Sequence, residues 1–188
     1  SRYAEFLDLA LEAVRALRIG DPREPSSTLG PMALPAAPDV LERRVEEARR
    51  SGARLLAGGR RTSVSGRGRW FEATLLADVP AGSEILVEET FGPVLPVVPV
   101  DSDEEAIRAM NESRYGLTAS IWTADPDRAE RIGRELDAGT VFQNRCDYLD
   151  PALPWTGVKE SGFGCTLSHL GFLGLTRPKS WHFRTRTR

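Results

Sequence analysis

Two adjacent carboxylates and an aromatic ring precede a Gly-Pro turn near the middle of the chain, in the run Glu88-Glu89-Thr90-Phe91-Gly92-Pro93-Val94. Gly92 can adopt backbone conformations that are closed to other residues, and Pro93 fixes φ and donates no hydrogen bond. Such a turn can hold a carboxylate and a ring rigidly at the mouth of a cleft. The plainer alternative is an acidic turn that simply leads into an apolar strand.

Few other side chains are of a type that could take part in catalysis or metal binding. Cys146 follows Arg145, a cation that can lower a thiol pKa, but a buried or idle thiol is the preferred interpretation of both Cys146 and Cys165. His169 and His182 have no ligand-like spacing with cysteines or carboxylates, so no metal site is expected. Neither a Gly-x-Gly-x-x-Gly motif nor a phosphate-binding Gly-x-x-x-x-Gly-Lys-Ser/Thr loop occurs in the sequence.

The elements before the acidic run alternate between helix and extended structure. Apolar residues at three- and four-residue spacing predict a helix that begins at Tyr3 and ends near Gly20. Asp39 is the expected N-cap of a second amphipathic helix. The further expectations are a strand over 53–57, an exposed Gly/Ser/Arg-rich loop over 58–69, and extended structure over 70–79 that breaks around Glu72-Ala73.

After the acidic run the pattern becomes strand, helix, strand, helix, strand. Pro96 and Pro99 favour an edge position for the strand over 94–100. The predicted elements that follow are a helix capped by Asp101-Ser102, a strand over 118–122, a helix from Asp125-Pro126 and a strand over 140–143. This order predicts an α/β fold with right-handed crossovers and a mainly parallel twisted sheet, closed by an antiparallel C-terminal strand over 179–185.

Composition excludes several classes of function. The 188 residues suffice for a proper core, and a formal net charge of −2 gives no electrostatic case for nucleic acid or membrane binding. No apolar run approaches the roughly 18 residues of a membrane-spanning helix. Two cysteines are too few for a disulfide framework, which makes the cytoplasm the expected compartment.

Three runs together resemble the aldehyde dehydrogenase superfamily. The run from Glu88 to Val94 is similar to its E-E-x-F-G-P-V signature, and Asn111 to Thr123 is similar to its N-x-x-x-Y-G-L-x-A-x-x-x-T segment. The third run, Gly139 to Gly164, contains P-W-T-G-V-K-E-S-G, which is similar to P-F-G-G-x-K-x-S-G of the family. Cys165 departs from the Arg that usually follows, which puts the family's usual contacts of that loop in doubt.

The resemblance implies roles for particular residues. Glu89 would hydrogen-bond the ribose hydroxyls of NAD or NADP, and Phe91 would pack beside the nicotinamide. Trp155 would line the aldehyde pocket, with plain core packing as its alternative. The loop Cys146, Asp147, Tyr148 and Leu149 would form part of the same wall, with a variable surface turn as its alternative.

The resemblance also implies that the rest of the machinery lies elsewhere. The family oxidises aldehydes to acids through a thiohemiacetal on a Cys thiolate. That nucleophile, the general base and the dinucleotide-binding domain lie before the position where this chain begins, so the expected function is the C-terminal catalytic-domain segment of an NAD(P)-dependent enzyme, inactive by itself. The alternatives are a non-catalytic module for assembly or partner binding and, remotely, a small enzyme of another class that uses Cys146.

The expected organisation is one partial catalytic domain over 1–178 and an oligomerisation strand over 179–188. In the family such a strand extends the sheet of a neighbouring subunit, so Trp181 and Phe183 would anchor a dimer or tetramer. A charged edge strand that discourages aggregation is the simpler interpretation of the basic tail.

Overall fold

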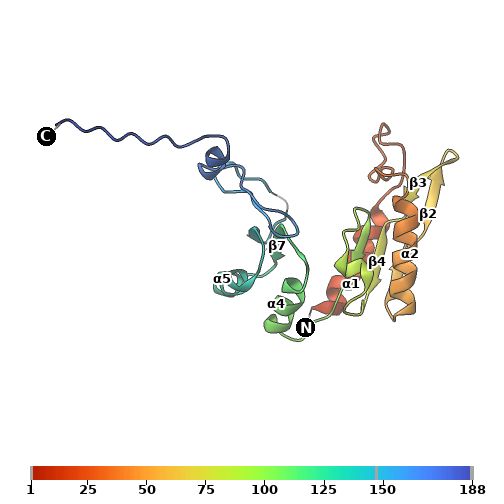
Figure 1. Ribbon diagram of the computed structural model, residues 1–188. Helices are drawn as coiled ribbons and strands as arrows, with labels where there is room; N and C mark the ends of the chain where they lie inside the picture. The colour runs from red at the N-terminus through yellow and green to blue at the C-terminus, as the bar shows by residue number, and fades with distance from the viewer. Residues whose placement is uncertain (1, 147, 187–188) are drawn as a thin grey trace. The chain divides into compact units, whose positions relative to one another are not determined.

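The computed structural model describes residues 2–146 and 148–186, apart from the side chain of Arg67. The chain divides into two compact units, Ser1–Val100 and Asp101–Arg188 (Figure 1). The expected division at residue 178 stays a prediction. Among the described residues, no helix combines the length and the apolar character needed to span a bilayer.

The first unit is built around a three-stranded sheet with helices on both faces. Its central strand β4 pairs antiparallel with β1 and parallel with β5, while β2 and β3 form a separate antiparallel pair. Figure 1 shows α2 on one side of this sheet and α1 on the other. The elements are α1 (Tyr3–Ala16), α2 (Ala37–Arg50), β1 (Arg54–Ala57), β2 (Arg61–Val64), β3 (Arg67–Phe71), β4 (Thr74–Ala77), α3 (Glu84–Val87) and β5 (Val94–Pro96).

Both faces of β4 are covered. Successive strand residues point to opposite faces, yet Leu75 and Leu76 are both fully buried. On the α2 side, Leu76 packs in one cluster with Leu41 and Val45 of α2 and with Phe71. This unit therefore has a closed apolar core.

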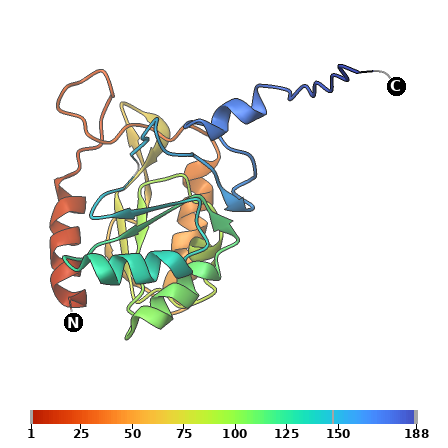
Figure 2. The same cartoon turned by 90° about the vertical axis from the view of Figure 1, so that its left-hand side faces the viewer.

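The second unit contains a strand-helix-strand crossover. Strands β7 and β8 pair in parallel, and α5 connects them and packs against both (Figure 2). Strands β6 and β9 form an antiparallel pair. The elements are α4 (Asp103–Asn111), β6 (Tyr115–Gly116), β7 (Thr118–Ile121), α5 (Pro126–Glu135), β8 (Thr140–Gln143), β9 (Val158–Lys159) and a 3-10 helix (Leu170–Gly174).

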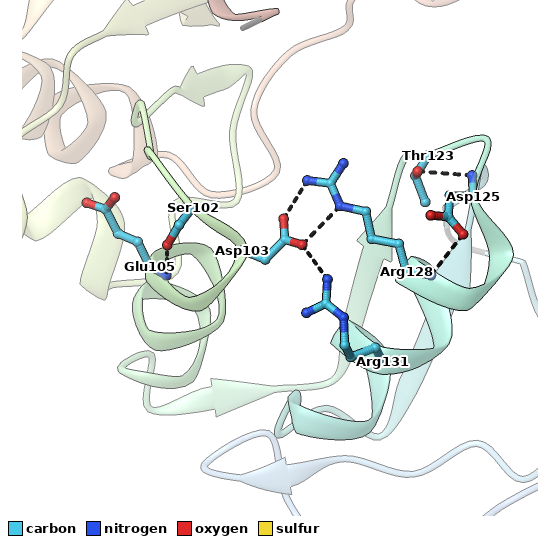
Figure 3. A network of polar contacts seen from close by, with 7 residues as sticks. All are labelled: Ser102, Asp103, Glu105, Thr123, Asp125, Arg128 and Arg131. Carbon is cyan, nitrogen blue, oxygen red and sulfur yellow. Dashed lines mark hydrogen bonds and ion pairs between the residues drawn. The ribbon is translucent and has the colours of Figure 1, made fainter.

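The predicted cap of α4 and the predicted start of α5 are confirmed. The Ser102 hydroxyl accepts a hydrogen bond from the backbone N–H of Glu105 at 3.1 Å. The Asp125 carboxylate accepts one from the N–H of Arg128, also at 3.1 Å. Figure 3 shows both caps, together with Asp103, the first residue of α4, which pairs with Arg128 and Arg131 of α5.

Several local expectations are wrong. Helix α2 begins at Ala37 with Pro38 in its first turn, so Asp39 is not its N-cap and lies inside the helix. The segment 58–69 contains most of the β2–β3 hairpin, whose turn residues Ser65 and Gly66 both have positive φ, 52° and 73°. Helix α1 ends three to four residues early, because Leu17 is extended and Ile19 bridges to Leu29.

The α/β class is confirmed, as is the break between β3 and β4 at Glu72-Ala73. Strand β5 is the predicted edge strand but covers only three residues. Residues 179–186 form no strand within the described part of the chain. Their expected pairing is with a neighbouring subunit, and it stays a prediction.

Candidate functional site

The acidic turn lies between α3 and β5, at the end of the sheet. Phe91 occupies the left-handed region with φ 41°, an uncommon conformation for a non-glycine residue. Its ring is 81% exposed, an unusual position for a large apolar side chain so close to a closed core. The backbone thus presents an aromatic ring to the outside at a fixed point.

Gly92 has a different role from the one expected. Its φ does not lie in the positive region, so the unusual conformation belongs to Phe91 instead. A Cβ atom at Gly92 would lie 2.3 Å from Cδ1 of Leu41 and 3.0 Å from the terminal methyl of Met32. Glycine is therefore required because the turn packs directly onto the buried face of α2.

Helix α2 holds the turn at a second point. The guanidinium of Arg44 donates to the backbone oxygen of Glu89 at 2.8 Å and to the Glu84 carboxylate at 2.8 Å. Hydrogen bonds from Arg43, the larger contribution, and from Arg44 lower the pKa of Glu84 to about 2. Arg44, with a side chain only 12% exposed, fixes α3 and the turn to the same helix.

The Glu89 side chain is left available. It is exposed, and within the described residues no hydrogen bond or ion pair engages its carboxylate. A carboxylate is an acceptor-only group that can bind two hydroxyl donors at once. Since its backbone is fixed by Arg44, this group fits the vicinal hydroxyls of a ribose.

A hollow of about 200 Å³ lies in the second unit, alongside β8, all of whose residues line it. Tyr148 and Trp155, both predicted pocket residues, line it together. Trp155 is fixed by paired backbone hydrogen bonds with Thr166 at 2.8 and 2.9 Å. The other lining residues are Thr140, Val141, Phe142, Gln143, Arg145, Asp150, Leu153, Pro154 and Leu167.

Two of the remaining predicted loop residues do not line this hollow. Cys146 and Leu149 are exposed and lie outside its lining, and Asp147 lies outside the described residues. Arg145, considered from the sequence only as a neighbour of a thiol, is part of the wall. Arg44 was missed altogether, and the available signal was its place one turn after Leu41, next to the apolar face of the amphipathic helix α2.

The two thiols are both free. Cys165 is half-buried, and its Sγ donates weakly to the backbone oxygen of Thr166 at 3.5 Å. No group of three or more His, Cys, Asp or Glu side chains among the described residues is arranged to hold a metal ion.

The C-terminal aromatic residues are open to the outside. Trp181 and Phe183 are 66% and 74% exposed, and their ring centroids lie 5.4 Å apart. The ammonium of Lys179 lies 4.6 Å from the Trp181 ring centroid. These contacts keep the pair together on an otherwise extended segment.

Comparison with known proteins agrees with the sequence motifs. A model of the aldehyde dehydrogenase family matches residues 1–181. The probable succinate-semialdehyde dehydrogenase [NADP(+)] of Synechocystis is 36% identical over 176 residues, which cover 94% of this chain and 38% of that protein. The chloroplastic betaine aldehyde dehydrogenase of Beta vulgaris is 34% identical over 89% of this chain and 34% of its own length.

Solved structures show the same fold. An aldehyde dehydrogenase of Bacillus cereus in complex with NAD+ matches with a TM-score of 0.84 at 31% identity, covering 90% of this chain and 34% of that one. The betaine aldehyde dehydrogenase of Staphylococcus aureus, also with NAD+, matches with a TM-score of 0.85 at 28% identity, covering 92% and 35%. The chain thus spans little more than a third of the length of these proteins.

Proposed function

Since the chain belongs to the aldehyde dehydrogenase family, we propose that it supplies the ribose contact, part of the aldehyde pocket and the assembly strand of an NAD(P)-dependent aldehyde dehydrogenase. The observation that carries this proposal is the turn at Glu89 and Phe91. It presents a free carboxylate and an exposed ring, and α2 holds it rigidly through Arg44 and Leu41.

Each group would have a definite task. When bound, the nicotinamide accepts the hydride that leaves the substrate. Glu89 would accept hydrogen bonds from ribose hydroxyls, and Phe91 would limit where the ring can lie. Tyr148 and Trp155 would exclude water from the aldehyde and orient it. Orientation and water exclusion of this kind can contribute much of a rate enhancement.

The chain by itself is proposed to lack turnover. Cys146 and Cys165, the only thiols in the sequence, have no base within hydrogen-bonding distance among the described residues. A thiolate nucleophile needs such a base or another source of pKa depression. The purified 188-residue chain should give no NAD(P)H absorbance with an aldehyde, and reduction abolished by Cys146→Ser would contradict this.

The test of the proposed function uses the complete enzyme that carries these residues. It should reduce NAD+ or NADP+ in the presence of an aldehyde. Glu89→Gln should raise the KM for the dinucleotide roughly 10- to 100-fold, the effect of losing charged hydrogen bonds. Glu24→Gln, at another exposed carboxylate of the same unit, is the matched control and should leave that KM unchanged. A Glu89→Gln enzyme with an unchanged KM would remove the ribose assignment.

Assembly is the third part of the proposal. The exposed Trp181 and Phe183 pair is of the kind that becomes an interface anchor, because buried aromatic side chains dominate association energies. A chain that ends at Pro178 should have a smaller mass in light scattering than the full chain. An unchanged mass would exclude a role of this segment in a homo-oligomer. The cytoplasmic location stays a prediction.

A further inference from the structure

Arg145 places a positive charge in the wall of the second unit's hollow. Its Cζ atom lies 3.7 Å from the centroid of the Tyr148 ring, and both side chains line the hollow together with Trp155. A guanidinium stacked on an aromatic face keeps its N–H donors at the rim of the plane. Within the described residues no hydrogen bond or ion pair engages these donors.

The backbone that carries Arg145 is fixed to β7 on both sides. The Asn144 amide accepts from the N–H of Thr123 at 2.9 Å and donates to its backbone oxygen at 2.8 Å. The Ser120 hydroxyl donates to the backbone oxygen of Arg145 at 2.8 Å. Asn144 has φ 54°, which turns the chain sharply out of β8. The backbone that carries the Arg145 guanidinium is therefore rigid.

One carboxylate shares the hollow with this cation. Asp150 lines it too, but its Oδ1 already accepts from the N–H of Ala152 at 2.9 Å. The hydrogen-bonding capacity of Asp150 is thus partly used in the loop, while no other described residue hydrogen-bonds the Arg145 donors. The aromatic face of Tyr148 is occupied by Arg145, so a quaternary ammonium group would find this face taken and would meet a like charge.

We propose that Arg145 is a specificity-determining residue and that it selects aldehydes bearing a carboxylate at the end remote from the carbonyl. The inference rests on the proposed aldehyde dehydrogenase function and names the substrate class of the same pocket. A hollow of about 200 Å³ suits a short chain of this kind. The carboxylate would bind the Arg145 donors, and the aromatic walls would enclose the methylene groups.

A binding test needs no catalysis. Succinate, the acid that a four-carbon semialdehyde would yield, is titrated into the 188-residue chain, and the indole N–H signal of Trp155 is followed by NMR. We expect a saturable shift with succinate and at least a roughly tenfold weaker one with neutral succinamide. Arg145→Met should abolish the preference, and Arg134→Met, a matched charge loss on the outer face of α5, should keep it. Equal responses to both compounds, or none to succinate, would overturn the assignment.

A kinetic test uses the complete enzyme with three aldehydes of similar size: succinate semialdehyde, its neutral amide and betaine aldehyde. The carboxylate substrate should have the highest kcat/KM, and Arg145→Met should lower that value roughly 10- to 100-fold while the amide is unaffected. A preference for betaine aldehyde would overturn the inference and leave the proposed function intact. An enzyme that oxidises neither these three nor any other aldehyde of a wider panel would overturn the proposed function, whereas the succinate titration would still decide the role of Arg145.

Discussion

The first unit has a large core whose central residues are completely buried, whereas each residue of the second unit's smaller core is slightly exposed. Leu41, Leu75 and Leu76 of the first unit are 0% exposed. The core cluster of the second unit consists of Ile107, Ala119, Ile132 and Leu136, each 7–8% exposed. The turn at Glu89 and Phe91 thus rests on a large, fully buried support, and the hollow lined by Tyr148 and Trp155 rests on a smaller one.

This difference indicates how each unit positions its functional groups. In the first, tight packing of Gly92 on Leu41 leaves the turn with one arrangement, because close-packed interiors deform little. In the second, hydrogen bonds between Asn144 and Thr123 and between Ser120 and Arg145 fix the backbone around Arg145. Exposed Phe163 and Leu175 are apolar surface of the second unit that a neighbouring part of an enzyme could cover.

Cavity-forming substitutions in the two cores should show the difference between the units most clearly. Leu41→Ala should lower the free energy of unfolding by about 2–5 kcal/mol, toward the upper end, since the fully buried site cannot fill with water. Ile132→Ala in the second unit should fall toward the lower end of the same range. Urea unfolding followed by circular dichroism measures both values.

The control for this comparison is Leu34→Ala. Leu34 belongs to the first unit but is 68% exposed, so its removal should change the free energy of unfolding by less than about 0.5 kcal/mol. If Ile132→Ala cost more than Leu41→Ala, the ranking of the two cores would be wrong.

Gly92→Ala should have the next largest effect on the free energy of unfolding, and it should also disturb the turn at Glu89 and Phe91. The added methyl group would overlap Leu41, and overpacking of this kind costs about 1–3 kcal/mol. We also expect the turn to move, so the KM of the complete enzyme for NAD(P)+ should rise along with the loss of stability.

Gly68→Ala is the matched control, because a Cβ atom there would meet nothing within 4 Å and φ is not positive. It should be neutral or slightly stabilising, since alanine loses less backbone entropy on folding. A Gly92→Ala protein with unchanged stability and KM would show that the turn has room to adapt.

Much of this architecture could be predicted from local chemistry. Ser102 and Asp125 stand directly before helical patterns and have acceptors that reach the N–H group three residues on, so the cap of α4 and the start of α5 followed from the sequence. The β2–β3 hairpin was missed because its Arg-rich strands lack an apolar run. Its signal was the Ser65-Gly66 pair, since a two-residue primed turn needs positive φ at both positions.

The site was less predictable for a different reason. Glu89 and Phe91 stand out by type, but what fixes them is Arg44, whose contact spans 45 residues of sequence. Likewise, the cation-π contact between Arg145 and Tyr148 depends on a chain reversal that residue types alone do not specify. Long-range contacts of this kind arise from tertiary packing.

Asn144→Ala should have a smaller effect, confined to the second unit. It removes both hydrogen bonds to Thr123 and keeps a Cβ atom at φ 54°, which costs roughly 1–2 kcal/mol and loses the local polar compensation that asparagine provides. Asn144→Gly removes the same bonds without that strain, so it should be less destabilising. Urea unfolding of the pair separates the two contributions, and equal losses would mean that the backbone relaxes.

Acidification should give the smallest effect and should distinguish the two units by their ion pairs. Hydrogen bonds from Arg128, the larger contribution, and from Arg131 lower the pKa of Asp103 from 3.8 to about 2. Glu84 of the first unit is lowered from 4.5 to about 2 by Arg43 and Arg44. A carboxyl group whose pKa is lowered in the folded protein stabilises the fold fully at pH values above its ordinary pKa. This stabilisation is lost as the pH falls from the ordinary pKa towards the lowered one. Both contributions should therefore be complete above about pH 5 and decline towards pH 2.

The second unit should respond first, because Asp103 joins α4 to α5 where the core between them is thin (Figure 3). Amide exchange measured from pH 6 to pH 2.5 should show α5 losing protection at a higher pH than α2. Asp103→Asn should make the protection of α5 amides from exchange less dependent on pH. Glu84→Gln should have the same effect on the amides of α2 and α3 but not on those of α5. Simultaneous loss in both units, unaffected by either substitution, would mean that these ion pairs contribute too little to distinguish the units, as exposed pairs often do.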